Sequence, residues 1–250
     1  MLTILVSNDD GVHAPGLEIL AQALGQVANV VVVAPNTDCS GASHSLTLSR
    51  PLRASKLSNG YISLNGTPSD CVHLAVTGFF LQEPEMVISG INAGPNMGDD
   101  VLYSGTVAAA MEGRFAGYPS IAISSVGVEE EHFKTAAKVA LDLVQQLQFF
   151  PLPADTVLNV NVPSLSYEEL RGWKITRLGQ RHRAEPVIRQ TDPRGNEVYW
   201  IGLNGPENPG GEGTDFHAVS NGFVSLTPLH ADLTHYDAMS NLQQWISKKT

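Results

Sequence analysis

Two adjacent carboxylates are the first candidates for chemistry in this sequence. Asp9 and Asp10 follow the apolar run 2–7, which has the character of a buried strand, and Gly11 comes directly after them. Neighbouring carboxylates that face one crevice repel each other, and a hard divalent cation relieves the repulsion. A solvated turn with a helix-capping acid is the alternative. The position at the end of a buried strand favours a metal site.

Two neutral oxygen donors follow other predicted strands. Ser40 lies in a Ser- and Gly-rich loop after the run 30–34, and Asn92 lies in a loop after the run 86–89. Loops at the carboxyl ends of parallel strands meet at the crevice where open α/β sheets bind ligands. Carboxylate, hydroxyl and amide oxygens suit Mg²⁺, Mn²⁺ or Ca²⁺ better than zinc, which recruits His or Cys. The sequence therefore predicts one metal site from four residues: Asp9, Asp10, Ser40 and Asn92.

A helix start near this site offers donors for a phosphate. Ser104, Gly105 and Thr106 open a predicted helix that ends at about residue 116. The free N–H groups of a first helical turn and the helix dipole bind anions, and the two hydroxyls add donors. Plain N-capping by Ser104 is the alternative, and the two roles are compatible. No Gly-Lys-Ser/Thr of a Walker A loop is present, so NTPase chemistry of that type is not expected.

Other reactive residue types form no comparable pattern. His13 and His44 are interpreted as satisfied loop histidines, and the sequence contains no HExxH motif. Cys39 and Cys71 are too few for a disulfide framework or a cysteine zinc site and are expected to be reduced thiols. A serine hydrolase is disfavoured because G-x-S-x-G is missing. A dinucleotide-dependent oxidoreductase is disfavoured because no G-x-G-x-x-G follows the first strand.

The elements that position these residues alternate between strand and helix up to about residue 165. Strand patterns cover 2–7, 30–34, 86–89, 119–125 and 156–162, with short strands and a turn within 49–64. Helix patterns cover 15–27, 70–81, 104–116 and 129–150. This order predicts an α/β fold with a mostly parallel sheet and helices on both faces.

The remainder of the chain has a different pattern. Residues 171–230 contain no convincing helix, several strand-like segments (173–178, 198–201 and 222–227) and the Gly/Pro-rich stretch 205–213. A C-terminal helix is expected over 236–247. We therefore expect a catalytic core over 1–165 and, over 166–250, a β-hairpin-rich appendage with a C-terminal helix, the two forming one intertwined domain.

The net charge of the chain limits the classes of partner that it could bind. The chain has 25 Asp and Glu against 15 Lys and Arg, a net charge of −10. This excess argues against binding a nucleic-acid polymer and against a polybasic membrane anchor. Residues 171–194 hold seven basic and two acidic residues, a net charge of +5 that is interpreted as a subunit contact surface. No signal peptide or run of about 20 apolar residues is seen, so a cytoplasmic protein is expected.

Longer segments resemble a known family, the stationary-phase survival proteins called SurE. The matching segments are SNDDGVHAPG (7–16), SGASHSLT (40–47), GTPSDCV (66–72), SGINAGPNMGDDVLYSGTVAAAMEG (89–113), NVNVP (159–163), GTDFHAV (213–219) and TPLHADLT (227–234). The resemblance extends from residue 2 to about residue 235. It implies a metal-dependent phosphatase of nucleoside 5′-monophosphates, a 5′-nucleotidase. In some members the activity extends to 3′-nucleotides and short polyphosphate.

The resemblance also implies roles for individual residues. The family's ligands for Mg²⁺ or Mn²⁺ fall on the four oxygen donors named above. Its phosphate-proximal positions fall on Asn96, Ser104, Gly105 and Thr106. Its fold is a Rossmann-like three-layer core, and a C-terminal hairpin and C-terminal segment exchange between the subunits of a homodimer or homotetramer.

The expected reaction is hydrolysis of a phosphate monoester, with Asp9 and Asp10 as the catalytic residues. A divalent cation neutralises charge on the phosphate oxygens. The nucleophile is either a water molecule whose pKa the cation lowers or one of the two carboxylates. A broad phosphatase or exopolyphosphatase stays open as an alternative, and so does a non-catalytic nucleotide sensor on the same core.

Overall fold

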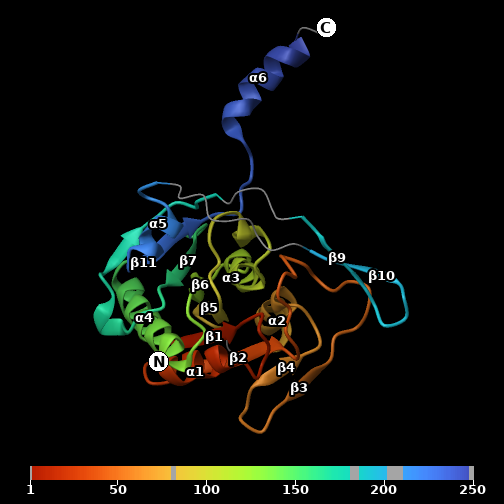
Figure 1. The fold of residues 1–250 in the computed structure, drawn as a ribbon. Coiled ribbons are helices and arrows are strands. Elements are labelled where there is room, and N and C mark those ends of the chain that lie inside the picture. The colour runs from red at the N-terminus through yellow and green to blue at the C-terminus, as the bar shows by residue number, and fades with distance from the viewer. Residues whose placement is uncertain (1, 80–82, 181–185, 202–210, 248–250) are drawn as a thin grey trace.

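The computed structural model describes residues 2–79, 83–180, 186–201 and 211–247. A nine-stranded sheet with the strand order β3-β4-β2-β1-β5-β6-β7-β11-β8 forms its centre (Figure 1). Its strands are β1 (Thr3–Ser7), β2 (Asn29–Pro35), β3 (Ala54–Lys56), β4 (Ile62–Leu64), β5 (Met86–Ala93), β6 (Ser120–Ser125), β7 (Val157–Val162), β8 (Trp173–Ile175) and β11 (Val224–Leu229). The pairings of β3 with β4 and of β11 with β7 are antiparallel and the other pairings are parallel, which confirms the mostly parallel sheet.

Helices cover both faces of the sheet. The helices are α1 (Pro15–Leu24), α2 (Pro68–Leu74), α3 (Gly105–Phe115), α4 (Glu130–Phe149), α5 (Asp215–Ser220) and α6 (Tyr236–Ser247). The side chains of β1 alternate between two hydrophobic clusters. Ile4 and Val6 pack in one cluster with α1 and α4. Leu5 packs in the other with α2 and α3. The three layers follow from this period of two, which turns successive apolar side chains to opposite faces.

The strand β5 is longer than the sequence pattern predicts. It runs past 86–89 to Ala93, and its pairing with β6 resumes at Asn92 opposite Ser124 after a register shift. A Cβ atom at Gly90 would lie 2.3 Å from the carbonyl oxygen of Ile123, so the close strand approach requires glycine there. Glycines in this stretch resemble a loop in sequence, which explains the short prediction.

The helix predicted over 70–81 begins earlier and changes type. Thr67 caps α2 by accepting the backbone N–H of Asp70, whose side chain accepts the N–H of Thr67 in return. After Leu74 the chain continues as a π-helix, Ala75–Phe79, and residues 80–82 lie outside the described part.

The prediction that residues 171–230 contain no helix is wrong. The helix α5 lies within this range, and the hydroxyl of Thr214 caps it by accepting the N–H of His217. Six residues are too few to show a helical period in sequence, and tertiary contacts stabilise this turn.

A boundary at residue 165 does not separate two folded units. The strands β8 and β11 follow it and complete the main sheet, so the appendage in the described part reduces to the hairpin β9 (Ile188–Thr191) and β10 (Glu197–Trp200) and to α6. Figure 1 shows both projecting from the body. Most of the Gly/Pro-rich stretch lies outside the described residues. Within the described ranges, no helix has the length and apolar character that crossing a bilayer requires.

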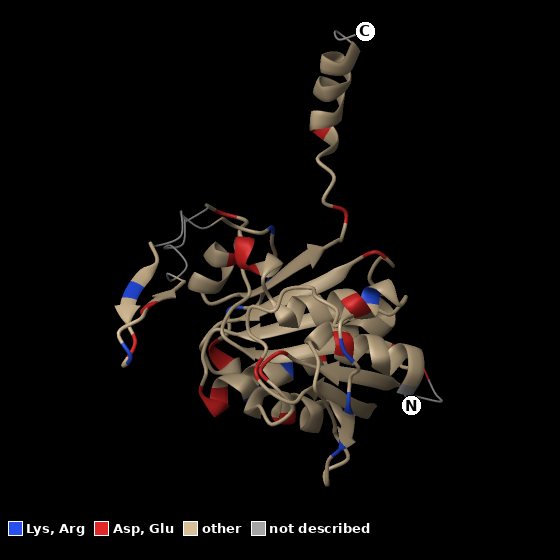
Figure 2. Cartoon of the chain, turned by 90° about the vertical axis from the view of Figure 1, so that its right-hand side faces the viewer, with Lys and Arg blue, Asp and Glu red and all other residues tan. Residues whose placement is uncertain are grey.

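The hairpin is less basic than the sequence count indicates. Arg181, Arg183 and Glu185 lie outside the described residues. In the described part, the guanidinium of Arg189 pairs with the carboxylate of Glu197 at 3.3 Å. Figure 2 shows acidic and basic positions together on this hairpin. Charge alone therefore does not define it as a basic surface.

Candidate metal and phosphate site

Asp9 lies at the carboxyl end of β1 and is nearly buried, with 4% of its surface exposed. The hydroxyl of Thr106 donates to its Oδ1, and its backbone carbonyl accepts the N–H of Cys39 at 2.8 Å. Burial raises the pKa of Asp9, although the hydrogen bonds from Thr106 oppose the shift. A carboxylate held in this way gains most from a cationic ligand.

Asp10 is only partly buried. Its Oδ2 accepts the backbone N–H of Ala93 at 3.0 Å, which ties the end of β5 to the end of β1. Burial raises the pKa of Asp10 to about 6, and the neighbouring charge of Asp9 adds to the rise. Ionisation of the two carboxylates is therefore less favourable than in water, and a bound cation would offset this cost.

Ser40 is exposed in the loop after β2, which approaches Asp9 through the N–H of Cys39. Its hydroxyl donates to Oδ1 of Asp38 at 2.6 Å, so the lone pairs of the hydroxyl oxygen point elsewhere. The charge of Asp38 adds a smaller contribution to the raised pKa of Asp9 and of Asp10. The sequence prediction missed Asp38, and an acid two residues before a predicted serine ligand is the signal that would reveal it.

Asn92 is oriented by its own turn. Its Nδ2 donates to the carbonyl of Gly94 at 2.8 Å, which leaves the side-chain oxygen as the available acceptor. Because Asn92 precedes Ala93, whose N–H binds Asp10, the end of β5 lies beside the end of β1, where the N–H of Cys39 also holds the loop of Ser40.

The donor set fits a hard cation. Two carboxylates of raised pKa, an oriented hydroxyl and an amide oxygen are the ligand types that Mg²⁺ and Mn²⁺ take. In the described ranges no group of three or more His, Cys, Asp or Glu side chains forms a metal site. Binding of a metal at this place would therefore depend on the neutral oxygens of Ser40 and Asn92.

The first turn of α3 packs directly on Asp9. A Cβ atom at Gly105 would lie 2.7 Å from Cβ of Asp9 and 2.9 Å from its Oδ2. Ser104 caps the helix, because its Oγ accepts the N–H of Val107 at 3.1 Å. The hydroxyl of Thr106 is engaged with Asp9, so Thr106 orients a carboxylate rather than offering a free hydroxyl. The expectation that the hydroxyls of Ser104 and Thr106 donate to a phosphate stays a prediction.

Asn96 lies at the carboxyl edge of the sheet, against Ser124 of β6 and Asn161 of β7, and is 8% exposed. Its Nδ2 donates to Oγ of Ser124 on β6 at 2.9 Å. Asn159 and Asn161 on β7 hydrogen-bond its backbone. The sequence prediction assigned no role to these two residues, although polar side chains inside a buried strand indicate a specific partner.

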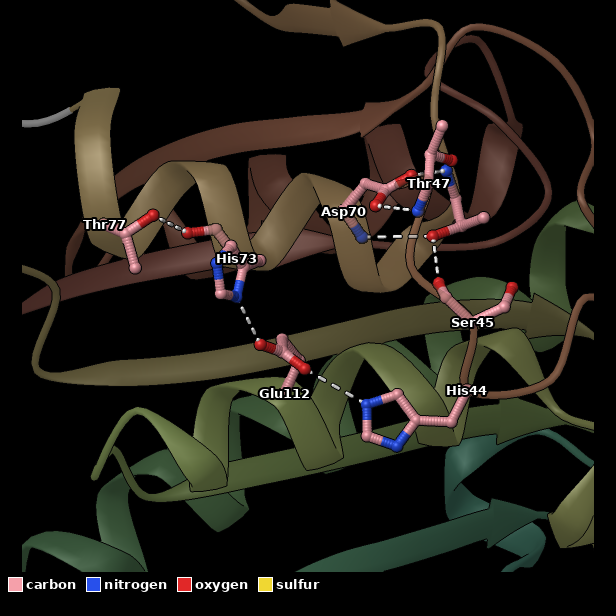
Figure 3. Close-up of polar contacts among 8 residues, drawn as sticks. His44, Ser45, Thr47, Asp70, His73, Thr77 and Glu112 are labelled. Atoms are coloured by element: carbon pink, nitrogen blue, oxygen red, sulfur yellow. Dashed lines mark hydrogen bonds and ion pairs between the residues drawn. The ribbon is translucent and has the colours of Figure 1, made fainter. Parts of the chain in front are cut away.

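Several hydrogen bonds anchor the loop of Ser40 to α2 and α3 (Figure 3). The N–H of Thr47 donates to Oδ1 of Asp70 at 2.8 Å, and the hydroxyl of Thr67 donates to the carbonyl of Ser45 at 2.6 Å. The carboxylate of Glu112 lies 3.1 Å from Nε2 of His44, which confirms His44 as a satisfied loop histidine. Hydrogen bonds from His44 lower the pKa of Glu112.

Known proteins match the chain over almost its whole length. A family model described as Survival protein SurE matches residues 4–185. A protein of Coxiella burnetii (strain RSA 331 / Henzerling II) named 5′-nucleotidase SurE is 58% identical over 247 residues, which span 99% of this chain and 96% of that protein. The crystal structure of SurE protein from Aquifex aeolicus superposes with a TM-score of 0.85 at 46% identity, covering 97% of this chain and 99% of that one.

Gly105→Ala tests the packing of α3 on Asp9. The added methyl group displaces the carboxylate, and a displacement of about 1 Å lowers turnover by about a hundredfold. Gly78→Ala is the control, because a Cβ atom there meets nothing within 4 Å. Steady-state phosphate release with both variants checks this, and equal rates would show that Asp9 tolerates the shift.

The raised pKa of Asp10 predicts a pH dependence of stability. Between pH 3.8 and about 6 the folded chain holds a proton that the unfolded chain has released. The free energy of unfolding of the metal-free protein therefore falls as pH rises through this window. Thermal unfolding in EDTA measures the slope, which Asp10→Asn should reduce and Asp155→Asn, on an exposed loop, should not.

Proposed function

The chain belongs to the survival protein SurE family, and from this premise we propose that it hydrolyses nucleoside 5′-monophosphates as a 5′-nucleotidase that requires Mg²⁺ or Mn²⁺. It is a phosphomonoester hydrolase by its similarity to the Coxiella protein over nearly the full length. The cation requirement rests on one observation: two adjacent carboxylates of raised pKa lie at the end of β1, where hydrogen bonds from Cys39 and Ala93 hold the loop of Ser40 and the end of β5 that carries Asn92.

Different residues of the chain would have different roles in the reaction. Asp9 and Asp10, with Ser40 and Asn92, would hold the cation. When bound, it supplies charge neutralisation at the phosphate oxygens and activation of the attacking group. Thr106 orients Asp9 through its hydroxyl. The N-terminus of α3 contributes positive potential to the same place, which favours a phosphate there.

We extend the proposal to 3′-nucleotides and short polyphosphate. The candidate groups for the anion are a helix N-terminus, Ser104 and Asn96, and such groups bind a phosphate whatever ester carries it. Initial rates on AMP, 3′-AMP and tripolyphosphate, measured with Mn²⁺ and with Mg²⁺, separate a strict 5′-nucleotidase from a broader phosphatase.

We also propose a cytoplasmic location. Cys39 and Cys71 are both free, and Cys71 is buried. Free thiols fit a reducing compartment.

Substitution of either carboxylate tests the metal site. Asp9→Asn and Asp10→Asn remove a charged ligand, and we expect turnover of AMP to fall about a hundredfold or more while the fold persists. Asp155→Asn is the exposed control. The measurements are phosphate release at saturating Mn²⁺ and calorimetric Mn²⁺ binding. Normal rates in both variants would refute the assignment, and wild-type release of phosphate that resists EDTA would refute the metal requirement.

Self-association is the second part of the proposal. The helix α6 stands away from the body (Figure 1) and leaves Met239, Leu242, Trp245 and Ile246 more than half exposed. An apolar stripe of this kind is unfavourable in water and fits burial against another subunit. We propose a homodimer or homotetramer in which C-terminal segments exchange.

Light scattering tests this assembly. We expect a mass of at least twice 26.8 kDa for the intact chain. Leu242→Glu, which places a charge in the apolar stripe, should shift the population toward the monomer. The control Gln243→Glu adds the same charge to a neighbouring position that is already polar. A monomeric wild-type protein would contradict the proposal.

A further inference from the structure

A fully buried carboxylate lies outside the residues discussed so far. Asp215, the first residue of α5, has no exposed surface. Its Oδ2 accepts the backbone N–H of Gly98 at 2.7 Å, and its Oδ1 accepts the N–H groups of Gly179 at 2.8 Å and of Phe216 at 2.9 Å. Burying a carboxylate is unfavourable unless hydrogen bonds replace its water, and here backbone donors do so. Asp215 thus joins segments that are far apart in sequence.

The backbone approaches Asp215 so closely that two glycines are required. A Cβ atom at Gly98 would lie 2.7 Å from the ring of Phe216, and one at Gly179 would lie 2.4 Å from the same ring. Gly98 also has a φ of +56°, which other residues seldom adopt. The position of Gly98 is therefore determined by Asp215 and by the packing of Phe216.

Gly98 lies two residues after Asn96, the candidate phosphate residue. The N–H of Asn96 donates to Oδ1 of Asn161 at 2.8 Å, and its carbonyl accepts Nδ2 of both Asn159 and Asn161 at 2.9 Å. The loop is thus held at Asn96 by β7 and at Gly98 by Asp215, and Asn96 has little freedom to move.

We propose that Asp215 is a positioning residue for phosphate recognition. By holding the N–H of Gly98, it keeps the loop 94–98 in the conformation in which Asn96 contacts the phosphate of the substrate. This inference rests on the proposed function and on the place of Asn96 in it. It adds a role for the segment after residue 165, because α5 determines the shape of a loop in the catalytic site.

The proposed role of Asp215 concerns binding of the phosphate and does not extend to binding of the metal cation. Asn92 and Ala93 are held by pairing with Ser124 and Ser125 on β6, and the N–H of Gly94 donates to the carbonyl of Ser125 at 2.9 Å. These bonds do not involve Asp215. Loss of the Asp215 contact should therefore weaken phosphate binding and leave metal binding intact.

Asp215→Asn tests the proposal with little change of volume. The two carboxylate oxygens of Asp215 accept the N–H groups of Gly98 and Gly179. In the amide of Asn one oxygen is replaced by an NH₂ donor, so one of these two hydrogen bonds is lost. Losing this hydrogen bond to a carboxylate lowers the population of the binding-competent loop by about tenfold, so KM for AMP and Ki for inorganic phosphate should rise about tenfold. We expect kcat to fall by no more than about threefold and the calorimetric Kd for Mn²⁺ to stay within about twofold.

Asp70→Asn is the matched control. Asp70 also lies in the first turn of a helix, and its two oxygens accept the N–H groups of Thr47 and Thr67, each at 2.8 Å (Figure 3). The amide of Asn again places an NH₂ donor where a carboxylate oxygen accepted a backbone N–H, but the affected contact is in the loop that carries Ser40. At saturating Mn²⁺ it should leave Ki for inorganic phosphate within about twofold of wild type.

A second variant guards against a failure of Asp215→Asn to fold. Ser124→Ala removes only the acceptor of the Asn96 side chain, and Ki for inorganic phosphate should rise by about threefold to tenfold with the melting temperature preserved. The proposal is wrong if a folded Asp215→Asn keeps the wild-type Ki, or if Asp70→Asn raises it equally. If Asp215→Asn does not fold, an unchanged Ki in Ser124→Ala overturns it. A wild-type protein without phosphatase activity would refute the proposed function itself.

Discussion

The burial of two neighbouring carboxylates at the end of β1 is the constraint on which the rest of the site depends. Burial raises the pKa of Asp9 and of Asp10, because the crevice removes water that would solvate their charges. When both are ionised, they also repel each other. A divalent cation would relieve both effects, so an arrangement that destabilises the metal-free fold would become the basis of the metal affinity that we propose. Thr106, Gly105 and the loops of Ser40 and Asn92 are arranged around this pair.

Helix-borne carboxylates hold the loops that surround the pair. Asp70 on α2 accepts a backbone N–H from the loop of Ser40, and Glu112 on α3 binds His44 of the same loop. Asp215 on α5 accepts the N–H of Gly98 in the loop of Asn96. Each helix is packed against the sheet, so a short carboxylate side chain transfers the rigidity of the core to a loop. The loop of the candidate metal ligand and the loop of the candidate phosphate residue thereby have separate supports.

The periodic elements of the fold could be predicted from the sequence. Buried parallel strands form continuous apolar runs and the helices show a clear amphipathic period, so the order of the catalytic core and the helix α6 are confirmed by the structure. Shorter or irregular features could not be predicted in this way. The helix α5 has six residues, and β5 continues through glycines that resemble a loop, because close packing against Ile123 requires them. The assignment of β8 and β11 to the main sheet also depends on pairing with a distant strand.

The sequence by itself predicted which oxygen donors lie at one edge of the sheet. Asp9, Ser40 and Asn92 follow successive parallel strands, and the topology of such a sheet brings those ends together. Only the tertiary structure decided how each donor is oriented. Thr106 binds Asp9 across 97 positions of sequence, and Asp215 reaches Gly98 across 117. Local patterns report periodicity and propensity, whereas these bonds depend on the packing of distant segments. The sequence therefore supplied the candidate residues of the site, and the packing of distant segments determined the hydrogen bonds that orient them.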